Sequence, residues 1–197
     1  MKKLISVLSI VVTLAVMTGC AGNTELIKTM STSISQDIFQ EVTQSTPPAP
    51  GYVDLRIYSS MKTHKPGMYS ETDPHGTPNY TMLVNIDGQA IHLQGRLREE
   101  RSVARSMLDA EEGSGIRYQF ETKLRIKAGT HKVVVAIPAD DLATAKEVVI
   151  TEGEIYSLTI EPRYGTIPGK QRPGLYGMTS FKQGVRSFRL LLNGKAI

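Results

Sequence analysis

Histidine and carboxylate side chains are the first candidates for metal binding or acid–base chemistry in this sequence. The four histidines are His64, His75, His92 and His131, and no two of them have the spacing typical of metal ligands. Glu71, Asp73 and His75 fall within five residues of one predicted loop. These groups would bind a metal only if the loop folded back on itself, and we expect a solvated turn instead. His131 follows Gly129 and is expected at the start of a strand.

The usual motifs of nucleophilic catalysis and phosphate binding are not found in the sequence. There is no Gly-x-Ser-x-Gly elbow, and the glycines from Gly165 to Gly184 are irregularly spaced, without a strand-to-helix context. Asp109, Glu111 and Glu112 are interpreted as one solvated helix end. Paired catalytic acids need burial to separate their pKa values, and nothing in the sequence indicates burial here. We therefore expect no enzyme. A hydrolase that uses His75 or His92 stays open, since a triad is assembled in space.

Cys20 is the only cysteine of the chain, and its neighbours indicate a use for its thiol. Met17, Thr18 and Gly19 precede it. These four residues resemble the bacterial lipobox, with Met17 where leucine is usual. The resemblance implies cleavage before Cys20 and a diacylglycerol on its sulfur, so that covalent lipid is the only group we expect the protein to carry. The mature protein would then have no disulfide and no cysteine metal site.

Residues 1–19 have the organisation of a cleaved lipoprotein signal peptide. Lys2 and Lys3 precede an apolar run from Leu4 to Met17, which is too short to cross a hydrocarbon core of about 30 Å. Two or three acyl chains would hold the mature protein on a membrane, since each buried CH₂ contributes about 0.8 kcal/mol. In the sorting rule that accompanies the lipobox, Ala21 implies the outer membrane. We predict a lipid-anchored envelope protein that faces the periplasm.

Residues 20–50 are predicted to be a tether between the lipid and a folded domain. The segment is rich in Ser, Thr and Gln and ends in Thr46-Pro47-Pro48-Ala49-Pro50, which favours extended backbone. As a flexible coil, thirty residues would span about 30 Å. A short amphipathic helix is an equal alternative, because apolar residues recur at three- and four-residue spacing: Ile27, Met30, Ile34, Ile38 and Val42.

Residues 51–197 show the two-residue alternation of strands with one buried face. The chain is 40% hydrophobic and 21% charged, as expected for one folded globular domain. The predicted strands lie in Val53–Ile57, Tyr80–Ile86, Ala90–Leu93, Tyr118–Lys127, Val133–Ile137, Lys146–Thr151, Tyr156–Ile160 and Phe188–Leu192. Asp87-Gly88 is the strongest hairpin signal. Short strands without alternating helices indicate a mainly β fold, an antiparallel sandwich.

One short helix is predicted inside this sandwich. Leu97, Val103, Ala104, Met107 and Leu108 fit a helical stripe between Leu97 and Gly113, and Gly113 is a suitable C-terminal stop. A charged loop is the alternative for the same residues.

The stretch from Val53 to Ile160 resembles PEGA-type domains and related small envelope sandwiches of bacterial lipoproteins. The resemblance rests on the hairpin at residues 84–89, on the LRIKAGTH segment at 124–131 and on the late strand EGEIYSLTI. The Pro-Glu-Gly-Ala signature itself is missing, and residues 98–112 form an insertion. The resemblance implies an immunoglobulin-like or transthyretin-like sandwich used in adhesion or assembly, and it supplies no catalytic residues.

Positive charge is concentrated in the C-terminal region, residues 162–197, which contains no acid. The formal charge of +4 falls to +2 when Lys2 and Lys3 are removed, so this region carries more than its share. It would attract lipid headgroups, anionic glycans or an acidic protein, and we exclude nucleic acid for an exported protein. The alternative is that these basic residues lie on the outward faces of ordinary strands and loops and have no role in binding. The candidate contacts are Arg163, Lys170, Arg172, Lys182, Arg186 and Arg189.

Together these features predict a non-enzymatic binding or interaction module, held on the membrane by lipid and recognising an envelope protein or an anionic glycan. A structural accessory subunit of a larger envelope complex is the alternative, in which an edge strand of the sandwich pairs with a partner.

Overall fold

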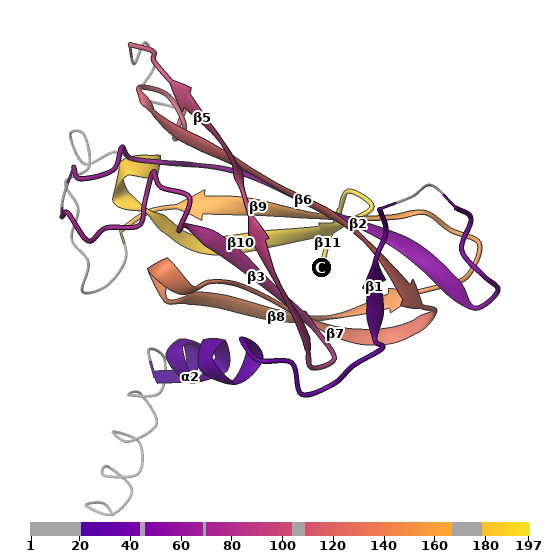
Figure 1. Ribbon diagram of the computed structural model, residues 1–197. Helices are drawn as coiled ribbons and strands as arrows, with labels where there is room; N and C mark the ends of the chain where they lie inside the picture. The colour runs from indigo at the N-terminus through magenta and orange to yellow at the C-terminus, as the bar shows by residue number, and fades with distance from the viewer. Residues whose placement is uncertain (1–20, 44–45, 69, 104–108, 167–178) are drawn as a thin grey trace, which may run out of the picture.

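The protein folds into two β-sheets packed face to face, with one helix outside them (Figure 1). This computed structural model describes residues 21–43, 46–68, 70–103, 109–166 and 179–197. The prediction of a mainly β fold built as a two-sheet sandwich is confirmed.

The larger sheet has seven strands, in the order β1-β6-β2-β9-β10-β11, with β5 also paired to β6. Their bounds are β1 Phe39–Glu41, β2 Tyr52–Thr63, β5 Arg96–Glu100, β6 Gly115–Lys127, β9 Tyr156–Tyr164, β10 Val185–Leu192 and β11 Lys195–Ala196. Strands β2 and β9 run parallel, so the expectation of a wholly antiparallel sandwich was wrong at this pair. The chain between them passes through strands of both sheets before β9 pairs with β2 in the same direction.

The smaller sheet has four antiparallel strands in the order β4-β3-β7-β8. Their bounds are β3 Thr81–Ile86, β4 Gln89–Gln94, β7 Gly129–Ile137 and β8 Leu142–Ile150, and the 3-10 helix η1, Pro138–Asp140, connects β7 to β8. The predicted hairpin is confirmed between β3 and β4. Asp87 and Gly88 both have positive φ, 47° and 91°, the backbone that a two-residue hairpin turn requires.

The core lies between the sheets, where side chains alternate as the sequence predicted. In β2, Val53, Leu55 and Ile57 are each only 1% exposed, and the residues between them face outward or are half-buried. Strand β7 differs, because Val133 to Ile137 are buried without interruption. Both faces of the smaller sheet are therefore covered.

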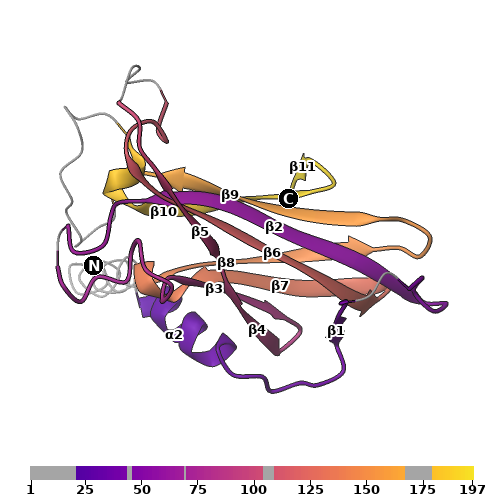
Figure 2. The same ribbon diagram turned by 45° about the horizontal axis from the view of Figure 1, so that its top comes forward.

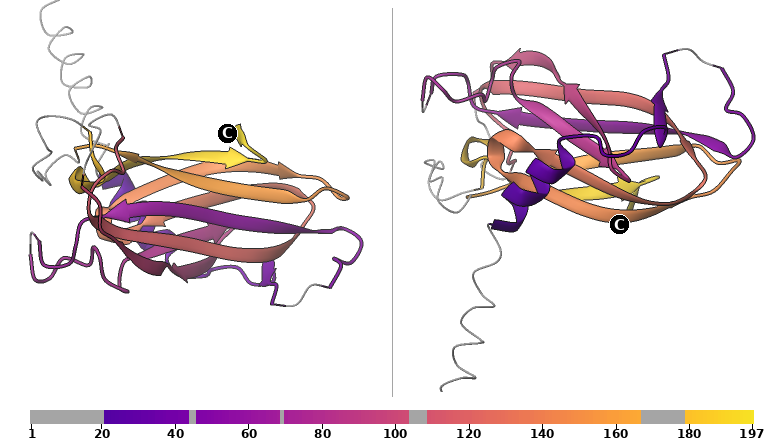
Figure 3. Two further views of the ribbon diagram at one scale, coloured as in Figure 1. Left: turned by 90° about the horizontal axis from the view of Figure 1, so that it is seen from above. Right: turned by 60° about the horizontal axis from the view of Figure 1, so that its bottom comes forward.

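The second cover is helix α2, Ala21–Met30, which lies across the outer face of the smaller sheet (Figures 2 and 3). Ile27 packs in a small cluster with Leu83 of β3 and Ala136 of β7. At one end of the helix the Thr24 hydroxyl donates to Asp141, at 2.8 Å, and at the other the Asn85 amide donates to the carbonyl of Met30, at 2.9 Å. The helix thus extends along the small sheet from Asp141, next to η1, to the level of Asn85 in β3.

The chain after α2 is also part of the fold. Ile34 N–H donates to the carbonyl of Gly88, and the amides of Ile38 and Phe39 donate to the side chain of Gln89. Strand β1 then pairs with β6 through Phe39, which is 6% exposed. Residues 21–43 are therefore docked: of the two equal expectations, the short helix is present at Ala21–Met30, and these residues are not a free tether. The observed helix is shorter than the stripe of apolar residues, which continues into this docked segment.

The inserted helix predicted between Leu97 and Gly113 was wrong at its start. Residues 96–100 form β5, which pairs with the end of β6 opposite to that used by β1. Backbone pairing along the free edge of β6 satisfies five residues at once, and local helical spacing does not compete with it. Residues 104–108, on which much of that prediction rested, lie outside the described part of the chain.

The sandwich has a histidine end and a hairpin end. The histidine end is where β2 finishes at Thr63, β3 begins at Thr81 and β8 begins at Leu142. The hairpin end, opposite to it, carries the Asp87-Gly88 turn. Several connections gather at the histidine end, as seen on the left of Figure 1.

Candidate functional site

The connection from β2 to β3 folds back on itself and buries two histidines. Gly76 makes the fold possible, because its φ is 73° and a Cβ there would lie 2.6 Å from Pro66 Cδ and 2.9 Å from the carbonyl oxygen of His64. Turns follow directly, with Thr77 N–H donating to Pro74 and Tyr80 N–H donating to Thr77. The result is a compact loop over residues 64–80, and the solvated turn expected around His75 was wrong: His75 is 2% exposed.

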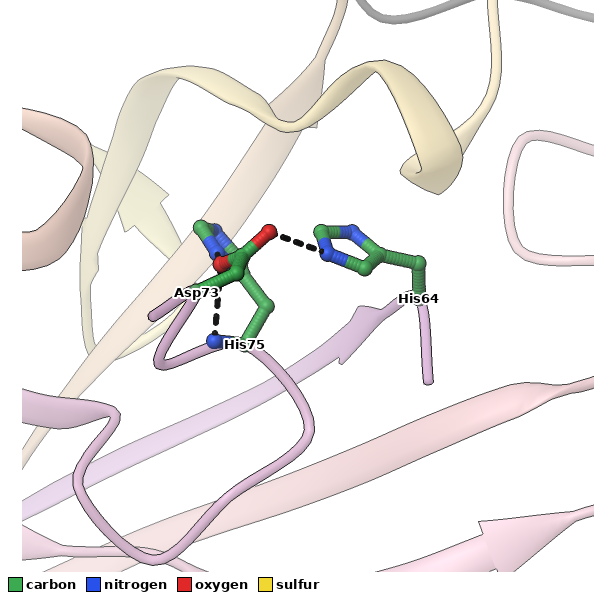
Figure 4. Close-up of side chains that lie close together, drawn as sticks. All are labelled: His64, Asp73 and His75. Carbon is green, nitrogen blue, oxygen red and sulfur yellow. Dashed lines mark hydrogen bonds and ion pairs between the residues drawn. The ribbon is translucent and has the colours of Figure 1, made fainter. Parts of the chain in front are cut away.

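His64, Asp73 and His75 meet inside this loop (Figure 4). The Asp73 carboxylate contacts a nitrogen of each ring. His64 Nε2 is 2.7 Å from one oxygen, while the backbone N–H of His75 donates to the other at 3.0 Å. His75 Nδ1 contacts that second oxygen as well. The loop thus places two imidazole nitrogens and one carboxylate around a common point.

Asp140 and Tyr80 complete the cluster from the other side. His75 Nε2 lies 2.9 Å from Asp140 Oδ1, and the Tyr80 hydroxyl donates to Asp140 Oδ2 at 2.7 Å. The rings stack in sequence, with centroids 4.7 Å apart from His64 to His75 and again 4.7 Å apart from His75 to Tyr80. Asp140 is 3% exposed and Tyr80 fully buried, so η1 and β3 hold the loop in place.

The contacts within the cluster shift two ionisation equilibria. Burial by itself raises the pKa of Asp73, but hydrogen bonds from the backbone and ring of His75, and from His64, lower it to about 2. Burial and the neighbouring Asp140 carboxylate raise the pKa of Tyr80 well above its usual value. Asp73 is therefore a carboxylate and Tyr80 a neutral hydrogen-bond donor at neutral pH.

The other two histidines lie elsewhere. His92 is exposed on β4, with Nε2 3.2 Å from the carbonyl of Ser31. His131 is in β7, as predicted near a strand start, and its ring joins Asp87 at 2.7 Å to the carbonyl of Lys127 at 2.8 Å. It thereby fastens two turns of the hairpin end. Neither residue reaches the loop over residues 64–80.

A second polar cluster lies beside the first, around the buried ammonium of Lys62, which is 2% exposed. Lys62 Nζ is 3.0 Å from Glu100 and donates to the carbonyl of Glu111 at 2.9 Å. Arg117 bridges the carboxylates of Glu100 and Glu111, each at 2.7 Å. The Tyr164 hydroxyl donates to Glu111 at 2.7 Å. Glu111 therefore belongs to a structural network and not to the solvated helix end that the sequence suggested.

The candidate basic contacts are only partly brought together. Arg163 on β9 and Arg186 on β10 are exposed near the histidine end, where Lys182 of the 3-10 helix η3, Phe181–Gln183, is half-buried. Arg189 faces Glu161 across the β9–β10 pair, at 3.8 Å, so its charge is partly offset. Lys170 and Arg172 lie outside the described residues, as does Cys20.

Most of the buried cluster was not predictable from the sequence. Asp73 and His75 stand close together in the chain, but His64 and Tyr80 lie at the two ends of the connection from β2 to β3, and Asp140 lies in η1. The signal that was present is Asp73-Pro74-His75-Gly76, a turn sequence in which both polar side chains are ligand types. In the described ranges, this cluster is also the one group of three such residues whose ligand atoms all lie within 4.8 Å of one another.

Comparisons with known proteins give no relative: no family model, no curated protein and no solved structure matches this chain. Within the described residues, no helix has the length and apolar character needed to cross a bilayer.

Proposed function

We propose that the protein is an envelope lipoprotein, acylated at Cys20, that acts as a non-enzymatic binding module on the outer membrane, facing the periplasm. One observation supports a defined role for the lipid: α2 includes Ala21, the residue directly after Cys20, and is docked on the sandwich. An acylated Cys20 would leave no flexible linker between the bilayer and the domain. The domain would stand on the membrane in a fixed orientation.

The direction of α2 determines that orientation. Its first turn is bound to Asp141 at the histidine end, and its last residue is bound to Asn85, toward the hairpin end. Lipid on the residue before the helix therefore places the histidine end next to the bilayer. The hairpin end points away and is free to meet a partner.

The exposed basic residues fit this orientation. Arg163 and Arg186 lie close to the histidine end, since β9 ends at Tyr164 and β10 begins at Val185. Anionic headgroups would attract them with about 1 kcal/mol for each charge near the surface. Anionic glycan or an acidic envelope protein would meet the same residues, and in the sequence Lys170 and Arg172 belong to the same basic segment, residues 162–197. On the resemblance to PEGA-type domains, we also propose that the sandwich is immunoglobulin-like or transthyretin-like.

The alternative function is that of an accessory subunit in a larger envelope complex. Strand β8 supports it: in the described residues its hydrogen-bonded neighbour is β7 alone, and Val149 is 60% exposed. An edge strand of nine residues is a template for pairing with another chain. Stoichiometric co-purification with a partner from detergent-solubilised envelopes, lost on a Val149→Lys substitution, distinguishes this function from the first.

The test uses the full chain in its host membrane. Cys20→Ser is expected to leave unprocessed precursor and to abolish labelling by radioactive palmitate, and continued labelling would refute the proposal. For orientation, Thr72→Cys at the histidine end and Glu154→Cys at the far end are labelled with a fluorophore, since acylation leaves no other thiol. Lipid-borne quenchers should quench the probe at residue 72 strongly and the probe at residue 154 weakly. Equal quenching would contradict the fixed orientation.

A further inference from the structure

We propose that His64, Asp73 and His75 form a binding site for a divalent transition metal, with Zn²⁺ as the ion it fits best. Two imidazole nitrogens and a carboxylate oxygen are a set of donors that Zn²⁺ accepts readily. Their ligand atoms lie within 4.8 Å of one another, and their side chains are 0%, 5% and 2% exposed in that order. The proposal does not depend on the lipid anchor.

Asp140 supplies the independent observation that points to a metal. Histidines that bind a metal through one nitrogen usually donate the other N–H to a carboxylate, which sets the tautomer and orients the ring. His75 has this arrangement: Nδ1 faces the common point of the cluster, and Nε2 lies 2.9 Å from Asp140 Oδ1. Asp140 is itself held by the Tyr80 hydroxyl. The supporting shell of a metal site is therefore already built.

Charge balance within the cluster agrees with a dication. Asp73 and Asp140 bring two negative charges into a region where the side chains are at most 5% exposed. One Zn²⁺ held by the two rings and by Asp73 would offset both of these charges.

Metal entry requires a small opening of the loop. Ligand atoms in a tetrahedral zinc site are separated by about 3.3 Å, as follows from Zn–N distances of about 2.0–2.1 Å. His64 Nε2 and Asp73 Oδ2 are now 2.7 Å apart, and His75 Nδ1 is in still closer contact with the same carboxylate, so Asp73 has to move away from both rings. Its neighbours Glu71 and Thr72 are exposed, and the turn in which Asp73 N–H donates to the carbonyl of Ser70 has to shift with it. The bound ion would tie the end of β2 to the loop and, through Asp140, to η1.

The experiment uses the full chain purified in detergent with a histidine-free affinity tag and stripped by a chelator. Zn²⁺ is titrated in competition with a chromophoric chelator, and Co²⁺ is added separately as a spectroscopic probe. We expect one Zn²⁺ per chain and the visible Co²⁺ absorption of tetrahedral nitrogen–oxygen ligation. A chain that binds no Zn²⁺, or binds it with no such Co²⁺ spectrum, overturns the proposal.

Variants locate the ion. His64→Gln and His75→Gln should each lower the affinity for Zn²⁺ at least 100-fold, while Asp140→Asn, which touches no metal in the proposal, should lower it by about 10–100-fold. His92→Gln and His131→Gln are the matched controls and should bind as the wild type does. Loss of binding in the controls with retention in His75→Gln would overturn the assignment. Circular dichroism verifies folding, and if a glutamine variant does not fold, the wild-type Co²⁺ spectrum decides.

Discussion

Replacing Glu100 by glutamine should destabilise the fold by about 2–3 kcal/mol at neutral pH. Arg117 donates to its carboxylate twice, at 2.7 and 3.2 Å, and Lys62 lies 3.0 Å away. Hydrogen bonds from Arg117 are the main reason that the pKa of Glu100 falls from 4.5 to about 2, against the effect of burial. Since each tenfold change in ionisation corresponds to about 1.4 kcal/mol, this difference amounts to about 3 kcal/mol. The side chain is 20% exposed, which reduces the expected value slightly.

The sign of the pH dependence follows from the lowered pKa. The unfolded chain binds a proton on Glu100 near pH 4.5, whereas the folded protein binds it only near pH 2. The stabilisation is therefore complete above the unfolded pKa and is lost as the pH falls through this window. The difference between wild type and Glu100→Gln should shrink over the same range.

The measurement is urea unfolding followed by circular dichroism at pH 7, 4 and 2.5. Glu99→Gln is the matched control: hydrogen bonds from Arg101 and Lys65 lower the pKa of Glu99 to about 2 as well, but this carboxylate lies in solvent. Solvent screens its ion pairs, so the control should change stability far less. Equal losses for the two variants, or a loss for Glu100→Gln that does not depend on pH, would refute the reasoning.

Two further substitutions test the loop and the helix. Gly76→Ala should lower the free energy of unfolding in urea by more than about 2 kcal/mol, because its Cβ would meet backbone atoms of Pro66 and His64. Gly153→Ala, where φ is positive but the space is open, should lower it by only about 1 kcal/mol. Similar losses in the two variants would mean that the contact with Pro66 and His64 is unimportant. Ile27→Ala should lower the free energy of unfolding by about 2 kcal/mol and speed hydrogen exchange and proteolysis in residues 21–43. Thr29→Ala, a change at an exposed position of the same helix, should have neither effect. Unchanged protection in Ile27→Ala would show that α2 is not held through Ile27.

Much of the sandwich was predictable because the burial of one face of a strand shows in the alternation of its own residues. The alternation in β2 and the Asp87-Gly88 turn depend on neighbours along the chain, so a two-residue period and one turn sequence were sufficient to place them. The parallel pairing of β2 with β9 was not predictable in this way, because the two strands are about a hundred residues apart. Strand β5 was mistaken for a helix for the same reason: its partner β6 lies beyond the insertion.

By itself, the sequence predicted the mainly β class and the principal hairpin, which the structure confirms, because both depend on residues close together in the chain. The resemblance of the residues around Cys20 to a lipobox also depends on adjacent residues, and it stays a prediction. Only the tertiary structure decided that residues 21–43 are docked and that His64, Asp73, His75 and Asp140 meet in one buried cluster. The physical reason is that burial converts a polar loop into a site: side chains that water would separate are held together once β2, β3 and η1 converge around them. Only Asp73 and His75 are close in the sequence, and the spacing of His64 and Asp140 does not indicate that convergence.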